Sequence, residues 1–137
     1  MKEPTILFVD DEDRNTVRYR EQLQKLGKVE YRRGADEAQV FFSDKDQLEG
    51  LSLVVLDLAM YTGKSMAEKQ TGYGRITGDA LRKELRKHWH GPVIVLSNSP
   101  DQGIKSQIEE DGDVFCRKPL TTPSELRKIV ESRLAPD

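Results

Sequence analysis

Five short apolar runs recur along the chain, at residues 5–9, 29–31, 53–56, 93–96 and 114–116. Each run has the length and composition of a β-strand. Four of them are apolar throughout, which is typical of parallel strands that are buried on both faces of a sheet. Residues 29–31 alternate between apolar and polar side chains instead. This run therefore predicts an edge strand.

The segments between these runs have helical periodicity. Three helices are indicated by apolar faces, at Tyr19, Leu23 and Leu26, at Ala38, Phe41 and Phe42, and at Leu81 and Leu85. Residues 101–111 offer only the pair Ile104 and Ile108, which favours a short, mostly exposed helix. The last helix has the clearest signal, because Thr122, Pro123 and Glu125 form a capping box ahead of one apolar stripe.

Strands that alternate with helices predict an α/β fold with a parallel sheet covered on both faces. Right-handed crossovers and an early edge strand favour a doubly wound five-stranded sheet of order 2-1-3-4-5, in a three-layer sandwich. The 137 residues are enough for one ordinary domain and leave no room for a second. We expect a single domain over residues 1–137.

Charge and hydropathy bear on which partners the protein can bind and on the compartment in which we expect it. The 22 basic and 24 acidic residues are mixed along the chain, so nothing predicts direct binding to nucleic acid or to an anionic membrane. No apolar run approaches the roughly 20 residues that span a bilayer, and the N-terminus lacks the features of a secretion signal. We expect a cytoplasmic protein, in agreement with the single cysteine, Cys116. The basic pairs Arg32-Arg33 and Arg82-Lys83 are interpreted as solvated.

Polar side chains gather at the predicted strand ends. Asp10 and Asp11 follow the first strand, Asp57 the third, Ser97 the fourth and Lys118 the fifth. Ligands of doubly wound sheets bind at this edge, where the strand order reverses. Each pair of carboxylates at ~4 Å would repel by about 4 kcal/mol at an effective dielectric near 20, so a cation must compensate. Oxygen ligands favour Mg²⁺, and the whole set suits phosphoryl transfer to Asp57.

These motifs resemble those of bacterial response-regulator receiver domains, which have the chemotaxis-type (CheY-like, flavodoxin-like) fold. The likeness rests on Ile6 to Glu12, Val54 to Leu58, Val93 to Ser97 and Phe115 to Pro119, and it covers nearly the whole chain. It implies a switch in a two-component system that catalyses only its own Mg²⁺-dependent phosphorylation and dephosphorylation. The implied donor is a phosphohistidine on a sensor histidine kinase or a histidine phosphotransfer protein.

The resemblance also implies a role for each site residue. Asp57 would be the phosphoacceptor, assisted by Lys118 and by Ser97, which would each bind a phosphoryl oxygen. The implied Mg²⁺ ligands are Asp11, Asp57 and the backbone carbonyl of Ala59, with Asp10 acting through water. Phe115 takes the place of the aromatic switch residue, which would follow the Ser97 hydroxyl. The signal would then reach a downstream effector protein through the face formed by residues 101–111, strand 114–116 and the last helix.

The chain departs from the pattern at two places. The connection at residues 58–77 is far longer than the usual βα loop of about 2–6 residues, and Tyr61 stands near the family's usual proline. We hypothesise a mobile, partly basic lid over the acceptor, with a tolerated surface insertion as the alternative. Asn98 stands where the family has a very small residue, so we expect it to alter dephosphorylation by limiting access to the phosphoryl group.

Two other functions are weighed against the receiver. A pseudo-receiver would keep the fold as a phosphorylation-independent interaction module, but all five key side chains are present. A phosphatase of the haloacid dehalogenase type needs a second aspartate two residues after its nucleophile, where this chain has Ala59. The sequence leaves open the kinase, the output, the phosphoryl lifetime, a phosphorylation-dependent homodimer, and whether the domain acts alone or belongs to a larger protein.

Overall fold

The computed structural model describes residues 3–64, 66–68, 71–72, 74–98 and 102–134. In chain order its elements are β1 (Thr5–Val9), α1 (Asp13–Leu23), β2 (Lys28–Arg32), α2 (Ala35–Phe42), α3 (Lys45–Glu49), β3 (Leu53–Leu56), α4 (Thr77–Leu85), β4 (Val93–Ser97), α5 (Gln102–Glu110), β5 (Val114–Arg117), the 3₁₀ helix η1 (Lys118–Leu120) and α6 (Pro123–Arg133).

The five strands form one parallel sheet of order β2-β1-β3-β4-β5, as predicted. β1 pairs with β2 from Thr5 opposite Lys28 and with β3 from Ile6 opposite Leu53. β4 then pairs with β3 and β5 in the same direction. The alternating strand does lie at an edge, and the strand order reverses between β1 and β3. That reversal places the carboxyl ends of both strands beside a common crevice.

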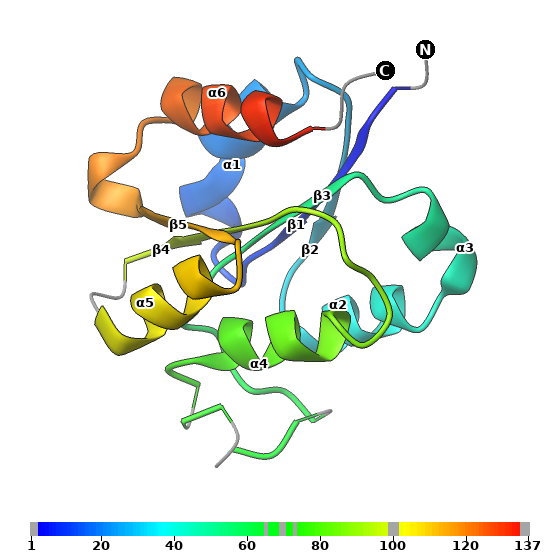
Figure 1. The fold of residues 1–137 in the computed structure, drawn as a ribbon, viewed down its shortest axis with the longest axis vertical. Helices are drawn as coiled ribbons and strands as arrows, with labels where there is room; N and C mark the ends of the chain where they lie inside the picture. Colours follow the sequence, from blue (N-terminus) through cyan, green and yellow to red (C-terminus); the bar gives the residue numbers. More distant parts are fainter. Residues whose placement is uncertain (1–2, 65, 69–70, 73, 99–101, 135–137) are drawn as a thin grey trace.

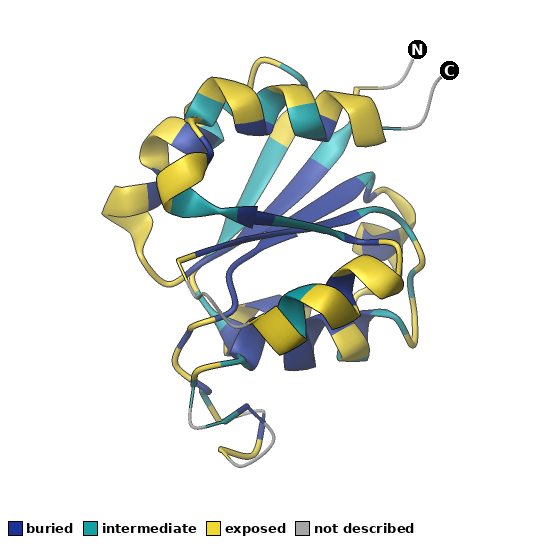
Figure 2. Ribbon diagram, turned by 60° about the vertical axis from the view of Figure 1, so that its left-hand side comes forward, coloured by how far each residue is buried: buried dark blue, intermediate teal, exposed yellow. Residues whose placement is uncertain are grey.

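Helices cover both faces of the sheet (Figure 1). α1 and α6 pack on one face, where Leu23 and Leu126 meet the β-strand residues Ile6 and Val55. α2, α4 and α5 pack on the other, where Phe41 contributes to the core. Figure 2 shows the result, a buried central sheet between helices whose outer surfaces are exposed. The predicted three-layer sandwich is confirmed.

Local signals explain why the first and last helices form where they do. The Thr122 hydroxyl accepts a hydrogen bond from the Glu125 amide at 3.2 Å, and the Glu125 carboxylate accepts one from the Thr122 amide at 3.1 Å. This is the predicted capping box, and it satisfies two amides that a helix start leaves unpaired. α1 buries Thr16, Tyr19 and Leu23, spaced three and four residues apart along a single face.

Two features depart from the sequence expectations. The short helix α3 follows α2 and begins at an Asp44 cap, whose carboxylate accepts from the amides of Asp46 and Gln47. The interpretation of Arg82 as solvated is wrong, because its side chain is 1% exposed and lies among aspartates. Lys83, its neighbour, is exposed as expected. In the part of the chain that the structure describes, no helix is long and apolar enough to cross a membrane.

Candidate functional site

The acidic pair at the end of β1 divides into one buried and one exposed carboxylate. Asp10 is 1% exposed, and its amide continues the strand pairing by donating to the carbonyl of Arg32 at 3.2 Å. Its Oδ1 accepts a hydrogen bond from the Glu12 amide at 2.9 Å. Asp11 is exposed, and its Oδ2 accepts from the amide of Tyr61 at 3.2 Å. The turn therefore directs the two side chains into different surroundings.

Asp57 follows directly on β3 and is 6% exposed. Its amide donates to the Val9 carbonyl at 3.1 Å, which fixes it beside the end of β1. Its Oδ1 accepts from the Leu58 amide at 2.7 Å. One carboxylate oxygen is thus held by the main chain, and Oδ2 lies on the Lys118 side.

Lys118 joins the two buried carboxylates. Its Nζ lies 2.9 Å from Asp10 Oδ2 and 3.0 Å from Asp57 Oδ2, and the side chain is 9% exposed. The residue begins η1, immediately after β5. The ends of three strands, β1, β3 and β5, therefore supply one compact group of two acids and one base. This is the convergence that the strand-end pattern predicts.

The charges in this group shift one another's protonation. Burial, followed by the repulsion of Asp57, raises the pKa of Asp10 from 3.8 to about 6. Burial acts to lower the pKa of Lys118, but the attraction of Asp57 and Asp10 outweighs it, and the net shift is upward. Lys118 is therefore firmly cationic. The raised pKa of Asp10 therefore reflects burial first and the Asp57 charge second, and the contact with Lys118 opposes both.

The remaining predicted residues lie on neighbouring elements and differ in how far they are buried. Ser97 ends β4, is fully buried and pairs in register with Arg117 of β5. Ala59 and Asn98 are exposed, and Asn98 follows Ser97 directly. Phe115 lies in β5, half-buried against the core on the α2–α4–α5 side of the sheet. The roles that the resemblance implies for Ser97, Ala59, Asn98 and Phe115 therefore stay predictions.

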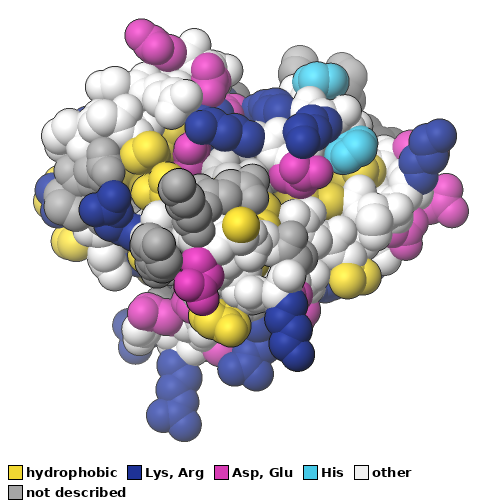
Figure 3. All heavy atoms as spheres, turned by 90° about the horizontal axis from the view of Figure 1, so that it is seen from below, with side chains coloured by type: hydrophobic (Ala, Val, Ile, Leu, Met, Phe, Trp, Pro, Cys, Tyr) yellow, Lys and Arg dark blue, Asp and Glu magenta, His cyan; other side chains and the backbone are white. Residues whose placement is uncertain are grey.

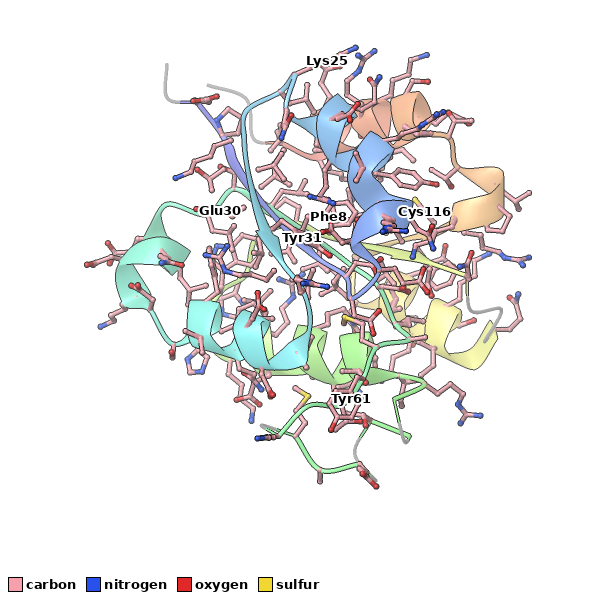
Figure 4. The ribbon with its side chains drawn as sticks, turned by 180° about the vertical axis from the view of Figure 1, so that it is seen from behind. Phe8, Lys25, Glu30, Tyr31, Tyr61 and Cys116 are labelled. Carbon is pink, nitrogen blue, oxygen red and sulfur yellow. The ribbon has the colours of Figure 1, made fainter. Side chains whose placement is uncertain are left out.

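Two tyrosines that the sequence did not mark as site residues bond the main chain of the site. The Tyr31 hydroxyl, from edge strand β2, donates to the Asp10 carbonyl at 2.7 Å. The Tyr19 hydroxyl, from α1, lies within hydrogen-bond distance of the Lys118 carbonyl at 3.2 Å and the Thr121 carbonyl at 2.7 Å. Figure 4 shows Tyr31 beside Phe8, and their ring centroids are 6.4 Å apart. No local signal marks these hydroxyls, because their partners are distant in sequence.

Arg20 secures Tyr31 in turn. Its guanidinium lies over the Tyr31 ring, 3.9 Å from the centroid, and it pairs with the Asp13 carboxylate at the start of α1. The same group donates to the Asp13 carbonyl at 2.9 Å. Such stacking of a guanidinium on an aromatic face contributes about 0.5–2 kcal/mol. The turn that carries Asp10 and Asp11 is therefore held by side chains from both β2 and α1.

The carboxylate oxygens at the site suit a hard cation better than a softer metal ion. Asp10, Asp11 and Asp57 offer carboxylate oxygens, and Mg²⁺ typically takes one or two carboxylates together with water and phosphate oxygens. Within the described residues, no three side chains of the histidine, cysteine, aspartate and glutamate types are already grouped as a metal site. Asp10, Asp11 and Asp57 are therefore the described side chains that could contribute to a Mg²⁺ site, together with water and phosphate oxygens.

Comparison with known proteins places the fold. Neither the scan against family models nor the search of curated proteins finds a match. Solved structures do match along nearly the whole chain. The Vibrio cholerae chemotaxis protein CheY4 is 18% identical, with a TM-score of 0.63 over 97% of this chain and 100% of that one.

Two further structures agree. A response-regulator signal receiver domain from Bermanella marisrubri is 17% identical, with a TM-score of 0.68 over 96% of this chain and 98% of its own. A Burkholderia pseudomallei response regulator, solved with a phosphorylated aspartic acid, a calcium ion and citrate, is 17% identical, with a TM-score of 0.65 over 96% of this chain and 66% of its own. The chain therefore has the fold of response-regulator receiver domains, and the resemblance drawn from its motifs is confirmed at this level.

Proposed function

We propose that this protein is a phosphoacceptor receiver that takes a phosphoryl group on Asp57. The observation that carries the proposal is the contact of Lys118 Nζ with both Asp10 and Asp57, at 2.9 and 3.0 Å, at three strand ends of a receiver fold. A buried aspartate beside a fixed ammonium is suited to accept a phosphoryl group, because such transfer depends mainly on positioning and charge neutralisation.

The proposed step is transfer from a phosphohistidine of a sensor histidine kinase or a histidine phosphotransfer protein. A carboxylate oxygen of Asp57 attacks phosphorus, the new O–P bond forms as the N–P bond breaks, and the electron pair remains on the donor imidazole nitrogen. The Leu58 amide orients the carboxylate through Oδ1. Lys118 then moves its ammonium contact from the carboxylate to a phosphoryl oxygen.

Magnesium belongs to the proposal as the resident cation. Asp11, Asp57 and the Ala59 carbonyl would hold it, with Asp10 acting through water, and it would neutralise charge on the phosphoryl oxygens. The Burkholderia pseudomallei structure, with its phosphorylated aspartic acid and calcium ion, supports both the acceptor chemistry and a divalent cation in this fold. Lys118 is shared between Asp10 and Asp57, and this sharing supports a role for a further positive charge at the site.

The output would be a conformational signal rather than turnover of a substrate. The buried Ser97 would donate its hydroxyl to the phosphoryl group, and Phe115 would follow it into the core. The α5–β5–α6 face would then bind a downstream effector or a second copy of the chain. Figure 3 shows acidic and basic side chains interspersed on the end of the molecule where the β3–α4 loop lies, so this end has no uniformly basic surface of the kind that binds nucleic acid. We propose the cytoplasm as its compartment.

Intact mass spectrometry after incubation with acetyl phosphate tests the acceptor. We expect one Mg²⁺-dependent phosphoryl adduct per chain, absent from Asp57→Asn and retained in Asp46→Asn, which removes an exposed carboxylate in α3 as a control. An adduct that persists in Asp57→Asn would assign the acceptor elsewhere. No adduct with any small phosphodonor would replace the proposal with a pseudo-receiver, and turnover of a generic phosphate ester would replace it with a phosphatase.

A further inference from the structure

The long connection between β3 and α4 is packed against the body of the protein. Met60 and Met66 are buried in the core cluster that includes α2 and α4. The hydroxyls of Thr62 and Thr71 lie 2.6 Å apart and are both buried. The Thr77 hydroxyl, at the start of α4, donates to the Met60 carbonyl at 2.6 Å. The described part of this loop is therefore packed against the protein and has buried contacts of its own.

The loop is attached to α2 at one specific place. Both carboxylate oxygens of Asp36 accept from the Lys64 amide, at 2.9 and 3.0 Å. Gly63 makes this approach possible, because it has φ +76 and a Cβ at this position would lie 2.5 Å from Asp36 Oδ1. Only glycine satisfies both the backbone conformation and the space. The first turn of α2 thus holds residues 63 and 64 directly.

The same stretch reaches the candidate site. Tyr61, two residues before Gly63, donates its amide to Asp11 Oδ2 at 3.2 Å, while its side chain is exposed. Figure 4 shows Tyr61 in the loop below α2 and α4. A cavity of about 320 Å³ lies between Asp11, Arg33 and Tyr61, so solvent reaches the Asp11 carboxylate from this side. Asp11 is therefore exposed to ions and yet fixed by one amide.

We propose that Asp36 is a positioning residue for Asp11: it fixes the Gly63-Lys64 segment and thereby holds the Tyr61 amide against the Asp11 carboxylate. This inference rests on the proposed function, in which Asp11 is a Mg²⁺ ligand. An unsupported aspartate on a surface turn would sample several rotamers, and a site is tighter when its ligands are already oriented. The long β3–α4 loop would thus orient the Asp11 carboxylate before Mg²⁺ binds.

Direct measurement of Mg²⁺ binding tests the inference without relying on phosphorylation. Isothermal titration calorimetry would compare the native chain with Asp36→Ala, Asp36→Asn and Glu37→Gln. We expect Asp36→Ala to weaken Mg²⁺ binding roughly tenfold, because loss of a residue that orients a metal ligand typically costs about 10–100-fold in affinity. Asp36→Asn should stay close to native, since its amide oxygen still accepts from Lys64. Glu37→Gln removes an equal charge from the same helical turn, keeps a side-chain oxygen that can accept from the Arg33 amide as Glu37 does at 3.1 Å, and should change little.

A second readout is independent of the metal. Amide hydrogen exchange in chelator should be faster at Tyr61 and Lys64 in Asp36→Ala and unchanged in Asp36→Asn. Gly63→Ala breaks the same contact from the loop side and should reproduce both effects if Asp36→Ala does not fold. Native Mg²⁺ affinity in a folded Asp36→Ala, or unchanged exchange at Tyr61, would overturn the inference and leave the proposed function intact. A native chain that binds no Mg²⁺ would instead overturn the metal-dependent proposed function, and this inference with it.

Discussion

Ionisation of the Asp10 carboxyl carries a free-energy cost even though Lys118 Nζ lies 2.9 Å away, because the carboxyl is buried and close to Asp57. Its pKa is raised to about 6, so the folded state binds a proton more tightly than the unfolded state does. The contribution of Asp10 to the free energy of unfolding should therefore fall as the pH rises from about 4 to about 6, and its loss should be complete above that range. This is opposite to the usual effect of an aspartate that is stabilised by an ion pair.

Asp10→Asn should therefore stabilise the protein in chelator at pH 7.5. One pKa unit corresponds to about 1.4 kcal/mol, and loss of an acceptor for Lys118 offsets part of the gain, so we expect about 1–2 kcal/mol. Urea unfolding at pH 7.5 and pH 4 measures it. The difference should be much smaller at the lower pH, where Asp10 is protonated in the folded state and about half ionised in the unfolded state. Equal or lower stability of the variant at pH 7.5 would contradict this account of the site.

The two tyrosine hydroxyls behind the site give a second prediction for single residues. Tyr31→Phe removes the donor to the Asp10 carbonyl, and Tyr19→Phe removes the donor to the Lys118 and Thr121 carbonyls. Each should lower the free energy of unfolding by about 0.5–1.5 kcal/mol. Each should also slow phosphorylation by acetyl phosphate, because the main chain that carries Asp10 or Lys118 is less fixed.

Initial rates followed by intact mass would measure this effect. Tyr61→Phe is the matched control, because it deletes a tyrosine hydroxyl on an exposed side chain of the same region. Its rate and stability should stay native. If both buried tyrosine variants also kept the native rate, the hydroxyls would serve stability alone.

Glycine determines how closely α4 approaches the acceptor. A Cβ on Gly78 would lie 1.7 Å from the Asp57 carbonyl oxygen, and the Gly78 amide donates to the Leu58 carbonyl at 2.9 Å. Gly78→Ala should therefore displace the start of α4 and cost at least about 3 kcal/mol, at the upper end of the range for overpacked cores. Chemical denaturation measures the loss.

Gly50→Ala is the control, since its added Cβ would have no neighbour closer than 3.9 Å. It should be neutral or more stable by up to about 1 kcal/mol, because it restricts the unfolded chain. A Gly78→Ala variant as stable as this control would show that α4 can shift away from Asp57 at little cost.

Elements with a strong local signal could be predicted from the sequence. The apolar strands, the alternating edge strand and the capped α6 all carry their pattern within a few residues, and the strand order followed from connection rules. α3 was missed because its five residues include a single buried apolar side chain, Leu48. The packing of the loop was also missed, because its contacts depend on residues far apart, such as Asp36 with Lys64.

The same division between near and distant partners applies to the candidate site. Its acidic and basic side chains stand at strand ends, so the topology alone brought Asp10, Asp57 and Lys118 together. The hydroxyls of Tyr19 and Tyr31 donate to carbonyls of other elements, so the sequence next to each tyrosine does not indicate its role. Arg82 is the clearest case, since its partners lie both in its own helix and about 30 residues further along.

Across the whole molecule, Arg82 links α4 to the turn between α5 and β5. Its guanidinium contacts Asp79 at 2.9 Å, Asp111 at 2.8 Å and Asp113 at 3.0 Å, and Arg86 also pairs with Asp113. Asp79 and Asp113 are buried, and Asp111 is half-exposed. Because α4 starts against Asp57 and the α5–β5 turn borders the proposed output face, this cluster connects the two ends of the proposed switch.

Arg82→Met tests how much of the stability of the molecule depends on that link. Methionine fills similar space but leaves Asp79 and Asp113 with one basic partner each, and breaking a buried ion pair costs about 3–5 kcal/mol. We expect a loss of about 3 kcal/mol at pH 7.5, measured by urea unfolding. Asp111→Asn removes only the half-exposed partner and should cost less than about 1 kcal/mol. Equal effects of the two variants would mean that Arg82 is compensated locally and that α4 and the α5–β5 turn are held together by apolar packing instead.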